Sequence, residues 1–198
     1  MKTLVAFFAF LTLTVTARAQ QIPAKPVIVP ANCHLIPTID HMQPSGIVDA
    51  THPIDLILIS KSKRKIYFIG KNQVIYAFTS AFGDGLGNKI EEGDGRTPEG
   101  TYQVSTKNTQ SDFHKSLGVS YPNANDLAYA KKYKVSAGGD IMIHGMSNKI
   151  SFANSITVAT AINLTDWTQG CVAVRNDQID AVFPHIKVGT KIEICPRD

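Results

Sequence analysis

The sequence predicts a mainly-β domain, of the β-sandwich or barrel-like type, with a few short helices. Short runs rich in β-branched and aromatic residues follow one another from residue 54 onward, with turn signals between them. Segments with the spacing of amphipathic helices are few, short and confined to the second half of the chain. About 179 residues remain after an N-terminal export signal, which suffices for one domain with a sizeable core.

Residues 1–19 are expected to be a secretory signal peptide. Lys2 precedes an apolar run over residues 4–15, and small residues surround the expected cleavage point. This run is too short to cross a hydrocarbon core of ~30 Å, and no later stretch approaches the roughly 20 apolar residues that a crossing takes. We therefore expect an exported protein without a transmembrane anchor, located in the periplasm, in the cell wall or outside the cell.

Residues 20–52 carry five prolines and little periodicity. They are expected to form an extended arm, with the folded domain over residues 53–198. Removal of the signal takes away Lys2 and Arg18, which leaves 18 basic against 16 acidic residues and a net charge of +2. A charge this small gives no argument for nucleic acid as a partner.

The domain is expected to open with a β-meander. Its strands fall on residues 54–60, 65–70, 73–80 and 100–106, and the first of them is apolar on both faces. A glycine-rich segment over residues 83–100 lacks the spacing of a phosphate-binding loop or an EF-hand. We expect this segment to be a long, irregular surface loop that borders a binding site.

The second half of the chain adds two helices to further strands. Residues 123–134 hold helix formers after Asn125. Residues 176–186 place apolar side chains at i, i+3, i+4 and i+7, with Asn176 as the expected N-cap. Strands are expected over residues 138–145, 171–174 and 191–195.

Three cysteines in an exported chain leave at least one thiol without an intramolecular partner. Cys33 lies in the arm and Cys195 in the last strand, and parity pairs these two and leaves Cys171 free. The sequence does not supply the Cα separation that a disulfide requires, so the pairing stays open at this point.

Cys171 is the candidate nucleophile and His144 the candidate base. A thiol attacks only as thiolate, which is a small fraction at neutral pH unless a base is near. His144 ends an apolar run before Gly145, which lets the backbone turn beside a rigidly held imidazole. Gly170 lets a substrate carbonyl approach backbone N–H groups that form an oxyanion hole. The alternatives are a thiol that only packs and a histidine that only satisfies one hydrogen bond.

Two other chemistries fit the sequence less well. The chain has no C-x-x-C or H-x-x-x-H cluster, so a metal site is not expected. A caspase-like protease also places H-G before a cysteine, but roughly 50 residues before it and with glycine where Ala173 stands.

The segments "IMIHG" and "WTQGCVAV", followed by Asn176, resemble the signature of YkuD-type L,D-transpeptidase catalytic domains. The upstream segments "IDLILISKSKRKIYFI", "GDGRTPEGTYQV" and "SLGVSYPNAND" also resemble that family, and the likeness covers about residues 53–195. Where the family commonly has histidine and arginine, this chain has Gln169 and Ala173.

The resemblance implies an enzyme that acts on peptidoglycan stem peptides without a metal or organic cofactor. His144 takes the proton of Cys171, and the thiolate attacks the carbonyl of the third residue of one stem to form a thioester. An amine of a second stem then attacks this thioester and gives a 3-3 cross-link. The Gly145 carbonyl is expected to orient His144. Water as acceptor gives instead an L,D-carboxypeptidase or a hydrolase, and a wall-attached protein is a further candidate acceptor.

The resemblance also assigns residues around the nucleophile. Thr168 is expected to steady the cysteine turn, Gly170 to contribute to the oxyanion hole, and Gln169 to lie against the substrate. Arg175 is expected either to meet a substrate carboxylate or to be an ordinary solvated side chain. A non-catalytic module that binds the cell wall is the alternative of another class, and it predicts an inert thiol.

Overall fold

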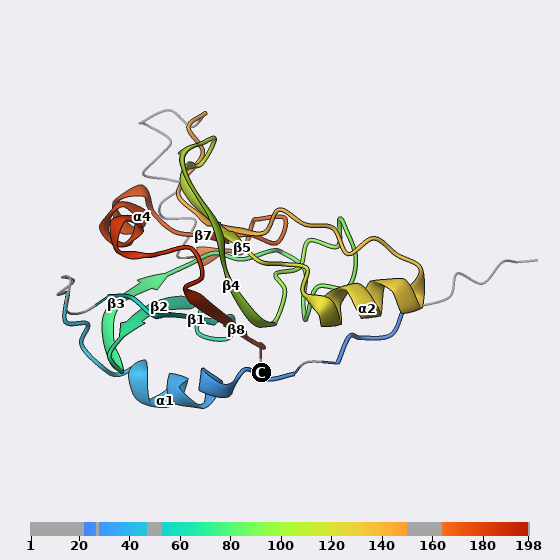
Figure 1. Ribbon diagram of the computed structural model, residues 1–198, viewed down its shortest axis with the longest axis horizontal. Coiled ribbons are helices and arrows are strands. Elements are labelled where there is room, and N and C mark those ends of the chain that lie inside the picture. The colour runs from blue at the N-terminus through green and yellow to red at the C-terminus, as the bar shows by residue number, and fades with distance from the viewer. Residues whose placement is uncertain (1–21, 27, 47–52, 150–163, 198) are drawn as a thin grey trace, which may run out of the picture.

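The apolar runs of the sequence form one curled, eight-stranded sheet with the order β3-β2-β1-β8-β4-β5-β6-β7 (Figure 1). The pairs β1–β8 and β6–β7 are parallel, whereas all other neighbours run antiparallel. The strands are β1 Leu56–Ser60, β2 Lys65–Gly70, β3 Gln73–Thr79, β4 Gly100–Ser111, β5 His114–Val119, β6 Met142–His144, β7 Val172–Ala173 and β8 Lys191–Cys195. The predicted mainly-β class is confirmed.

The computed structural model describes residues 22–26, 28–46, 53–149 and 164–197. The expected signal peptide at residues 1–19 lies outside these ranges. Within them, no helix has the length and apolar character that a membrane crossing requires.

The two ends of the sheet meet next to β7. Ala81, just beyond β3, forms an antiparallel bridge with Ala173 of β7 through two N–H···O bonds of 3.0 and 2.8 Å. Gly83 and Thr168 form a second bridge, which is parallel. The sheet therefore curls into a half barrel, and the glycine-rich loop starts beside the segment that leads into β7.

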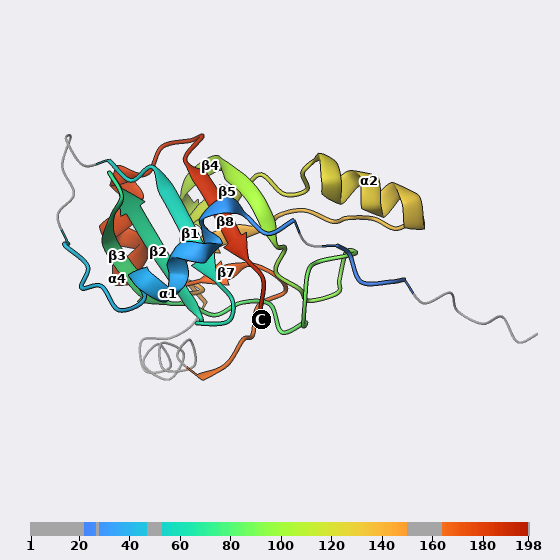
Figure 2. The same cartoon turned by 90° about the horizontal axis from the view of Figure 1, so that it is seen from below.

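The N-terminal segment is not extended throughout, which corrects the expectation for residues 20–52. Residues Ala31–Leu35 form the 3-10 helix η1, and Ile36–Ile39 form the short helix α1. These helices lie across the sheet (Figure 2) and pack buried apolar side chains against Leu58 of β1. Because Ile57 on the other face of β1 points into the main core, this strand needs a cover on both sides. Burial of the outer face of β1 explains why the N-terminal segment forms helical turns although it is rich in proline.

Both expected helices are present. α2 spans Ala124–Tyr133 and begins with a capping box, in which the Asn123 side chain accepts from the N–H of Asp126 at 3.1 Å and the Asp126 carboxylate accepts from the N–H of Asn123 at 2.9 Å. α4 spans Asn176–Val182 and continues as the 3-10 turn η2, Phe183–His185. The expected apolar stripe of α4 faces the main core, as the sequence predicts: Ile179, Val182, Phe183 and Ile186.

The N-cap of α4 is Arg175, which corrects the expectation for Asn176. Arg175 has extended backbone dihedral angles, and its N–H donates to the Gln178 side chain at 3.0 Å. Asn176 is the first helical residue, and its side chain is used elsewhere, as described below.

The sequence pattern does not predict β5 or the second half of β4. β4 runs on to Ser111, well past the expected end at residue 106, and turns directly into β5. The hairpin rises away from the body of the sheet (Figure 1). Its distal residues are mostly polar because little apolar surface lies beneath them, so they lack the alternation by which a half-buried strand is recognised.

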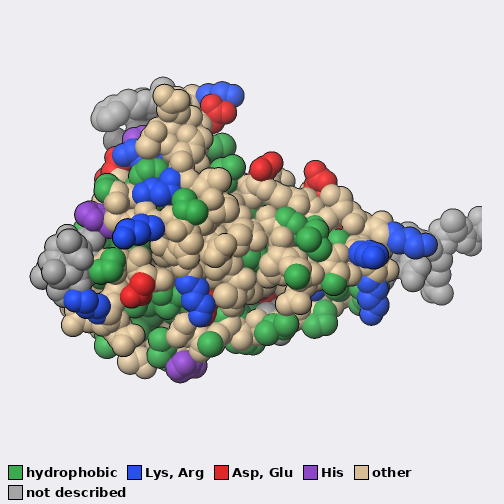
Figure 3. All heavy atoms as spheres, viewed as in Figure 1, with side chains coloured by type: hydrophobic (Ala, Val, Ile, Leu, Met, Phe, Trp, Pro, Cys, Tyr) green, Lys and Arg blue, Asp and Glu red, His purple; other side chains and the backbone are tan. Residues whose placement is uncertain are grey.

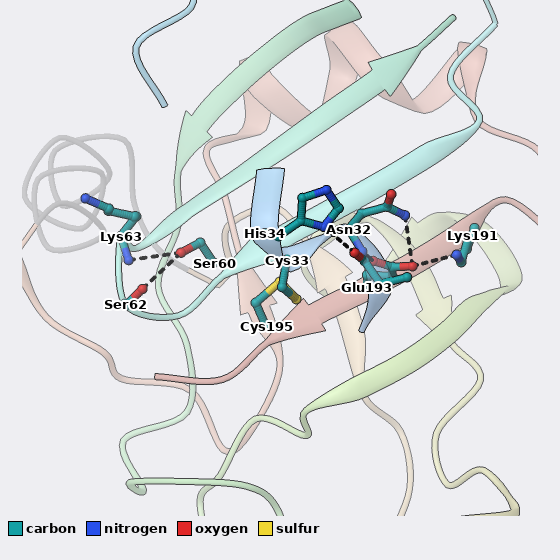
Figure 4. The surroundings of a disulfide bond; sticks show 10 residues. Asn32, Cys33, His34, Ser60, Ser62, Lys63, Lys191, Glu193 and Cys195 are labelled. Carbon is teal, nitrogen blue, oxygen red and sulfur yellow. Dashed lines mark hydrogen bonds and ion pairs between the residues drawn. A yellow bond between two sulfur atoms is a disulfide. The ribbon is translucent and has the colours of Figure 1, made fainter. Parts of the chain in front are cut away.

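A disulfide joins Cys33 of η1 to Cys195 at the end of β8, with a Cα–Cα distance of 5.7 Å (Figure 4). The open question about this pair is thereby answered in favour of pairing, and Cys171 is the free cysteine. Beside the disulfide, Asn32 donates its backbone N–H and its side-chain amide to the buried carboxylate of Glu193 at 2.8 and 3.0 Å. These contacts fasten η1 to β8.

Charged side chains on the face shown in Figure 3 are spread over the surface. Basic side chains gather at two places among the described residues of this face, one at the end that carries α2 and one near α4 and the β4–β5 hairpin. Acidic side chains lie between these two groups, so this face carries no continuous basic stripe.

Candidate active site

The register of β6 and β7 places Cys171 and His144 on the same face of the sheet. These strands are parallel neighbours, with His144 opposite Ala173. Side chains along a strand alternate between faces, and Cys171 comes immediately before β7 and two residues before Ala173. Continued by one residue, this alternation sets Cys171 diagonally across from His144, although 26 residues separate them along the chain.

His144 is almost fully buried, with 4% of its surface exposed. Its Nδ1 lies 2.6 Å from the carbonyl oxygen of Gly145. A carbonyl oxygen can only accept, so Nδ1 carries the proton and Nε2 is the basic nitrogen of the neutral ring. The rings of Phe113 and Trp167 flank the imidazole at centroid distances of 4.5 and 6.4 Å. This hydrogen bond to Gly145 fixes which way the imidazole ring faces.

Burial lowers the pKa of His144 below its ordinary value, and the hydrogen bond to Gly145 only partly offsets that effect. The thiol of Cys171 is partly exposed and lies 3.5 Å from the backbone oxygen of Asp140. Burial raises the pKa of this thiol, the Met142 N–H opposes the rise, and the charge of Asp140 adds to it. Both shifts favour a neutral imidazole beside a neutral thiol in the resting protein.

Thr168 closes the turn that leads to the thiol. Its hydroxyl donates to the backbone oxygen of Cys171 at 2.7 Å and accepts from the N–H of Gly170 at 3.2 Å. Gly170 has φ +121, and an added Cβ would lie 2.7 Å from the backbone oxygen of Arg96. Only glycine fits this position, because both the dihedral angle and the neighbouring backbone exclude a side chain. Gln169 is exposed beside the turn.

The glycine-rich loop packs against this turn, and several of its polar side chains are buried and hydrogen-bonded, which was not expected. Its irregular course agrees with the expectation for residues 83–100, but it is only in part a surface loop. Asp94 accepts from the backbone N–H of Ile90 and Arg96 at 2.8 and 3.0 Å. The buried ammonium of Lys61 donates to two loop carbonyls and, at 2.6 Å, to Glu99. Buried, fully paired polar groups of this kind fix a loop that lacks regular structure.

The guanidinium of Arg175 is paired with a neighbouring carboxylate. Its Nε and Nη2 donate to the Asp177 carboxylate at 3.0 and 2.7 Å, and this pair lies on the surface. The structure therefore agrees with the alternative of a solvated arginine. Asn176 was expected as a helix cap and as part of the family signature, and its Oδ1 accepts from the N–H of Met146 at 2.7 Å, next to the His144–Gly145 segment.

Three residues near the site carried no usable sequence signal. Phe113 stands in a polar hairpin, Trp167 reads as a packing anchor, and Asp140 reads as a polar strand residue. Asp140 has φ +54, which a sequence pattern does not reveal. In the part of the chain that the structure describes, no three His, Cys, Asp or Glu side chains are grouped so as to hold a metal ion.

The fold and the site together define a mainly-β domain with a thiol and an imidazole on one face of two adjacent strands. The sequence matches the family model of the YkuD L,D-transpeptidase catalytic domain over residues 54–194. The chain therefore belongs to this family.

The chain is also similar to individual proteins of known sequence or structure. The chain is 29% identical over 107 residues to the Escherichia coli K12 protein named "Putative L,D-transpeptidase YafK", a match that covers 53% of this chain and 34% of that protein. The helical cell shape determining protein Pgp2 from Campylobacter jejuni has a similar fold, with a TM-score of 0.55, 20% identity and coverage of 72% of this chain and 48% of that one. An L,D-transpeptidase from Xylanimonas cellulosilytica aligns with a TM-score of 0.47 and 13% identity over 83% of this chain and 69% of that one. The present chain thus matches about a third of the length of YafK.

Proposed function

We propose that this protein forms a thioester acyl-enzyme on Cys171 with peptidoglycan stem tetrapeptides and transfers the acyl group to an amine. The observation that supports the proposal is the parallel pairing of β6 with β7, in which His144 lies opposite Ala173, two residues after Cys171, while Nδ1 of His144 is bonded to the Gly145 oxygen. Only Nε2 is then available to take a proton.

The reaction starts from the neutral pair. Nε2 of His144 takes the thiol proton as the sulfur of Cys171 bonds to the carbonyl carbon of the third stem residue, commonly a diamino acid. The carbonyl oxygen becomes an oxyanion that backbone N–H groups stabilise. The N–H of Gly170 is already bonded to Thr168, so we assign the N–H of Cys171 as the main donor and Gly170 as the residue that allows the close approach.

Collapse of the tetrahedral intermediate breaks the bond to D-alanine. His144 returns its proton to the leaving amine, and a thioester remains on Cys171. An amine of a second stem then attacks the thioester carbonyl and gives a 3-3 cross-link, with the thiol restored. Water, or an amine of a wall-attached protein, is the alternative acceptor at the same thioester.

This function requires export, and residues 1–19 support it as a signal peptide. We place the mature protein in the periplasm or the cell wall, with peptidoglycan stem peptides as partners and with cell-wall remodelling and cell shape as its biological context.

Mature protein incubated with purified disaccharide tetrapeptides is expected to release D-alanine and to give dimers joined through their third residues. Mass spectrometry of the products is the measurement, with heat-inactivated protein as the control. Tripeptides without dimers identify a carboxypeptidase instead. Unchanged tetrapeptides, with a free thiol verified by titration, contradict the proposal.

The rate of acylation is expected to fall at acid pH, with a midpoint below the ordinary histidine pKa. The neutral imidazole is the base, and burial lowers its pKa, so the rate falls only as pH drops through that lowered value. The pH profile of the second-order rate constant for a carbapenem, followed by intact mass, measures this limb. A half-maximal point at or above pH of about 6.5 contradicts it.

A further inference from the structure

The geometry points to Asn176 as a positioning residue for His144, which acts through the peptide group between Gly145 and Met146. The inference rests on the proposed function for its catalytic meaning, since it concerns the base of that reaction. Asn176 itself touches neither the imidazole nor the thiol in the contacts of the structure.

Two hydrogen bonds meet on one amide group. The carbonyl oxygen of Gly145 accepts from Nδ1 of His144 at 2.6 Å, and the N–H of Met146 donates to Oδ1 of Asn176 at 2.7 Å. That oxygen and that N–H belong to the same planar peptide group, so rotation of this plane would break both bonds. Asn176 thereby fixes the direction in which the Gly145 oxygen points and, through it, the orientation of the ring.

The contact is built into the local structure. An added Cβ at Gly145 would lie 2.6 Å from Oδ1 of Asn176 and 3.1 Å from the backbone oxygen of Phe113, so only glycine admits this side chain. The N–H of Gly145 donates to the backbone oxygen of Lys115 at 3.1 Å, which holds the other side of the residue. Asn176 stands on the first turn of α4, and the buried Ile179 one turn later anchors that helix in the core.

The arrangement also affects the basicity of His144. An amide whose N–H is bonded to an acceptor has a more negative carbonyl oxygen, because hydrogen bonds in a chain polarise one another. The Gly145 oxygen therefore stabilises the imidazolium that forms when the ring takes the thiol proton. The hydrogen bond from His144 to Gly145 is the one that partly offsets the effect of burial on the histidine pKa. Asn176 supports that compensation from the far end of the amide.

Three variants separate this role from a general effect on folding. N176A removes the acceptor, and N176D keeps an acceptor oxygen in the same place and adds a negative charge. N148A is the matched control, because Asn148 also bonds to the backbone near the site, accepting from the N–H of His114 at 3.1 Å and donating to Ser111 at 2.9 Å. Asn148 has no contact with the Gly145–Met146 peptide among these bonds.

The first readout needs no substrate. Nitrogen-15 NMR of the histidine rings gives the tautomer and the pKa of His144 in each full-length mature variant. We expect the Nδ1–H tautomer in wild type, N148A and N176D, a raised pKa in N176D, and a lowered pKa with a mixed tautomer in N176A. An N176A protein with the tautomer and the pKa of wild type overturns the inference. If N176A does not fold, an N176D protein whose His144 pKa is unchanged overturns it equally.

The second readout is the rate of acylation by the carbapenem imipenem. N176A is expected to be about tenfold slower or more on the plateau of the pH profile, with its acid limb at lower pH, because the ring is misoriented and less basic. N176D is expected to stay near the wild-type plateau, with its acid limb at higher pH. A wild type that is not acylated, in the presence of the expected NMR changes, contradicts the proposed function and leaves the positioning role supported.

Discussion

The Cys171→Ala variant is expected to lose covalent acylation entirely and to keep its fold. The thiol is partly exposed, and alanine keeps the Cβ and loses only the sulfur, which lies 3.5 Å from the Asp140 oxygen, so the fold is expected to persist. The chemical consequence is complete, because alanine has no nucleophile for the thioester. Intact mass after incubation with imipenem measures the adduct, and thermal unfolding measures the fold.

Cys171→Ser is the matched control for this result. It keeps a hydrogen-bonding atom of similar size, but the pKa of a hydroxyl is far above that of a thiol, so the neutral imidazole removes its proton poorly. We expect no adduct on the time scale of wild-type acylation. A full adduct on Cys171→Ala places the nucleophile elsewhere and contradicts the mechanism.

The parts of the fold that follow from local pattern could be predicted from the sequence. β2 is readable as a short run of β-branched and aromatic residues, and the apolar stripe of α4 has the period of a helix. Cys171 and His144 could be singled out because glycine adjoins each of them at the end or start of an apolar run. Their proximity depends on the parallel pairing of β6 with β7, and no local pattern encodes that pairing.

The errors have a common physical origin in contacts between distant segments. The arm has the composition of an extended chain, yet it forms a helix because Leu58 of β1 needs cover on its outer face. The glycine-rich loop looks exposed, but Lys61, from outside the loop, pairs with its Glu99. Asn176 has the residue type and position of a helix cap, but its side chain instead accepts from the N–H of Met146, 30 residues upstream.

Loss of the disulfide is expected to cause the largest change in stability. Cys33 and Cys195 are 162 residues apart, so the bond closes a very long loop and restricts the unfolded state strongly. A loop of this length corresponds to about 5 kcal/mol of loop-closure entropy, and measured disulfides usually contribute about 2–4 kcal/mol. We expect the double variant C33S/C195S to lose an amount in that range, as measured by urea unfolding monitored by circular dichroism.

The control is Asn32→Ala, one residue from the disulfide. It removes the side-chain bond to Glu193 but keeps the disulfide and the backbone bond, so a loss of about 1 kcal/mol is expected. A reducing agent is expected to bring wild type down to the stability of C33S/C195S and to leave that variant unchanged. Cys171 is then the only remaining thiol, and the folded double variant is still expected to be acylated. Equal stability of C33S/C195S and wild type would mean that packing of η1 and α1, and not the covalent bond, holds the N-terminal segment on the sheet.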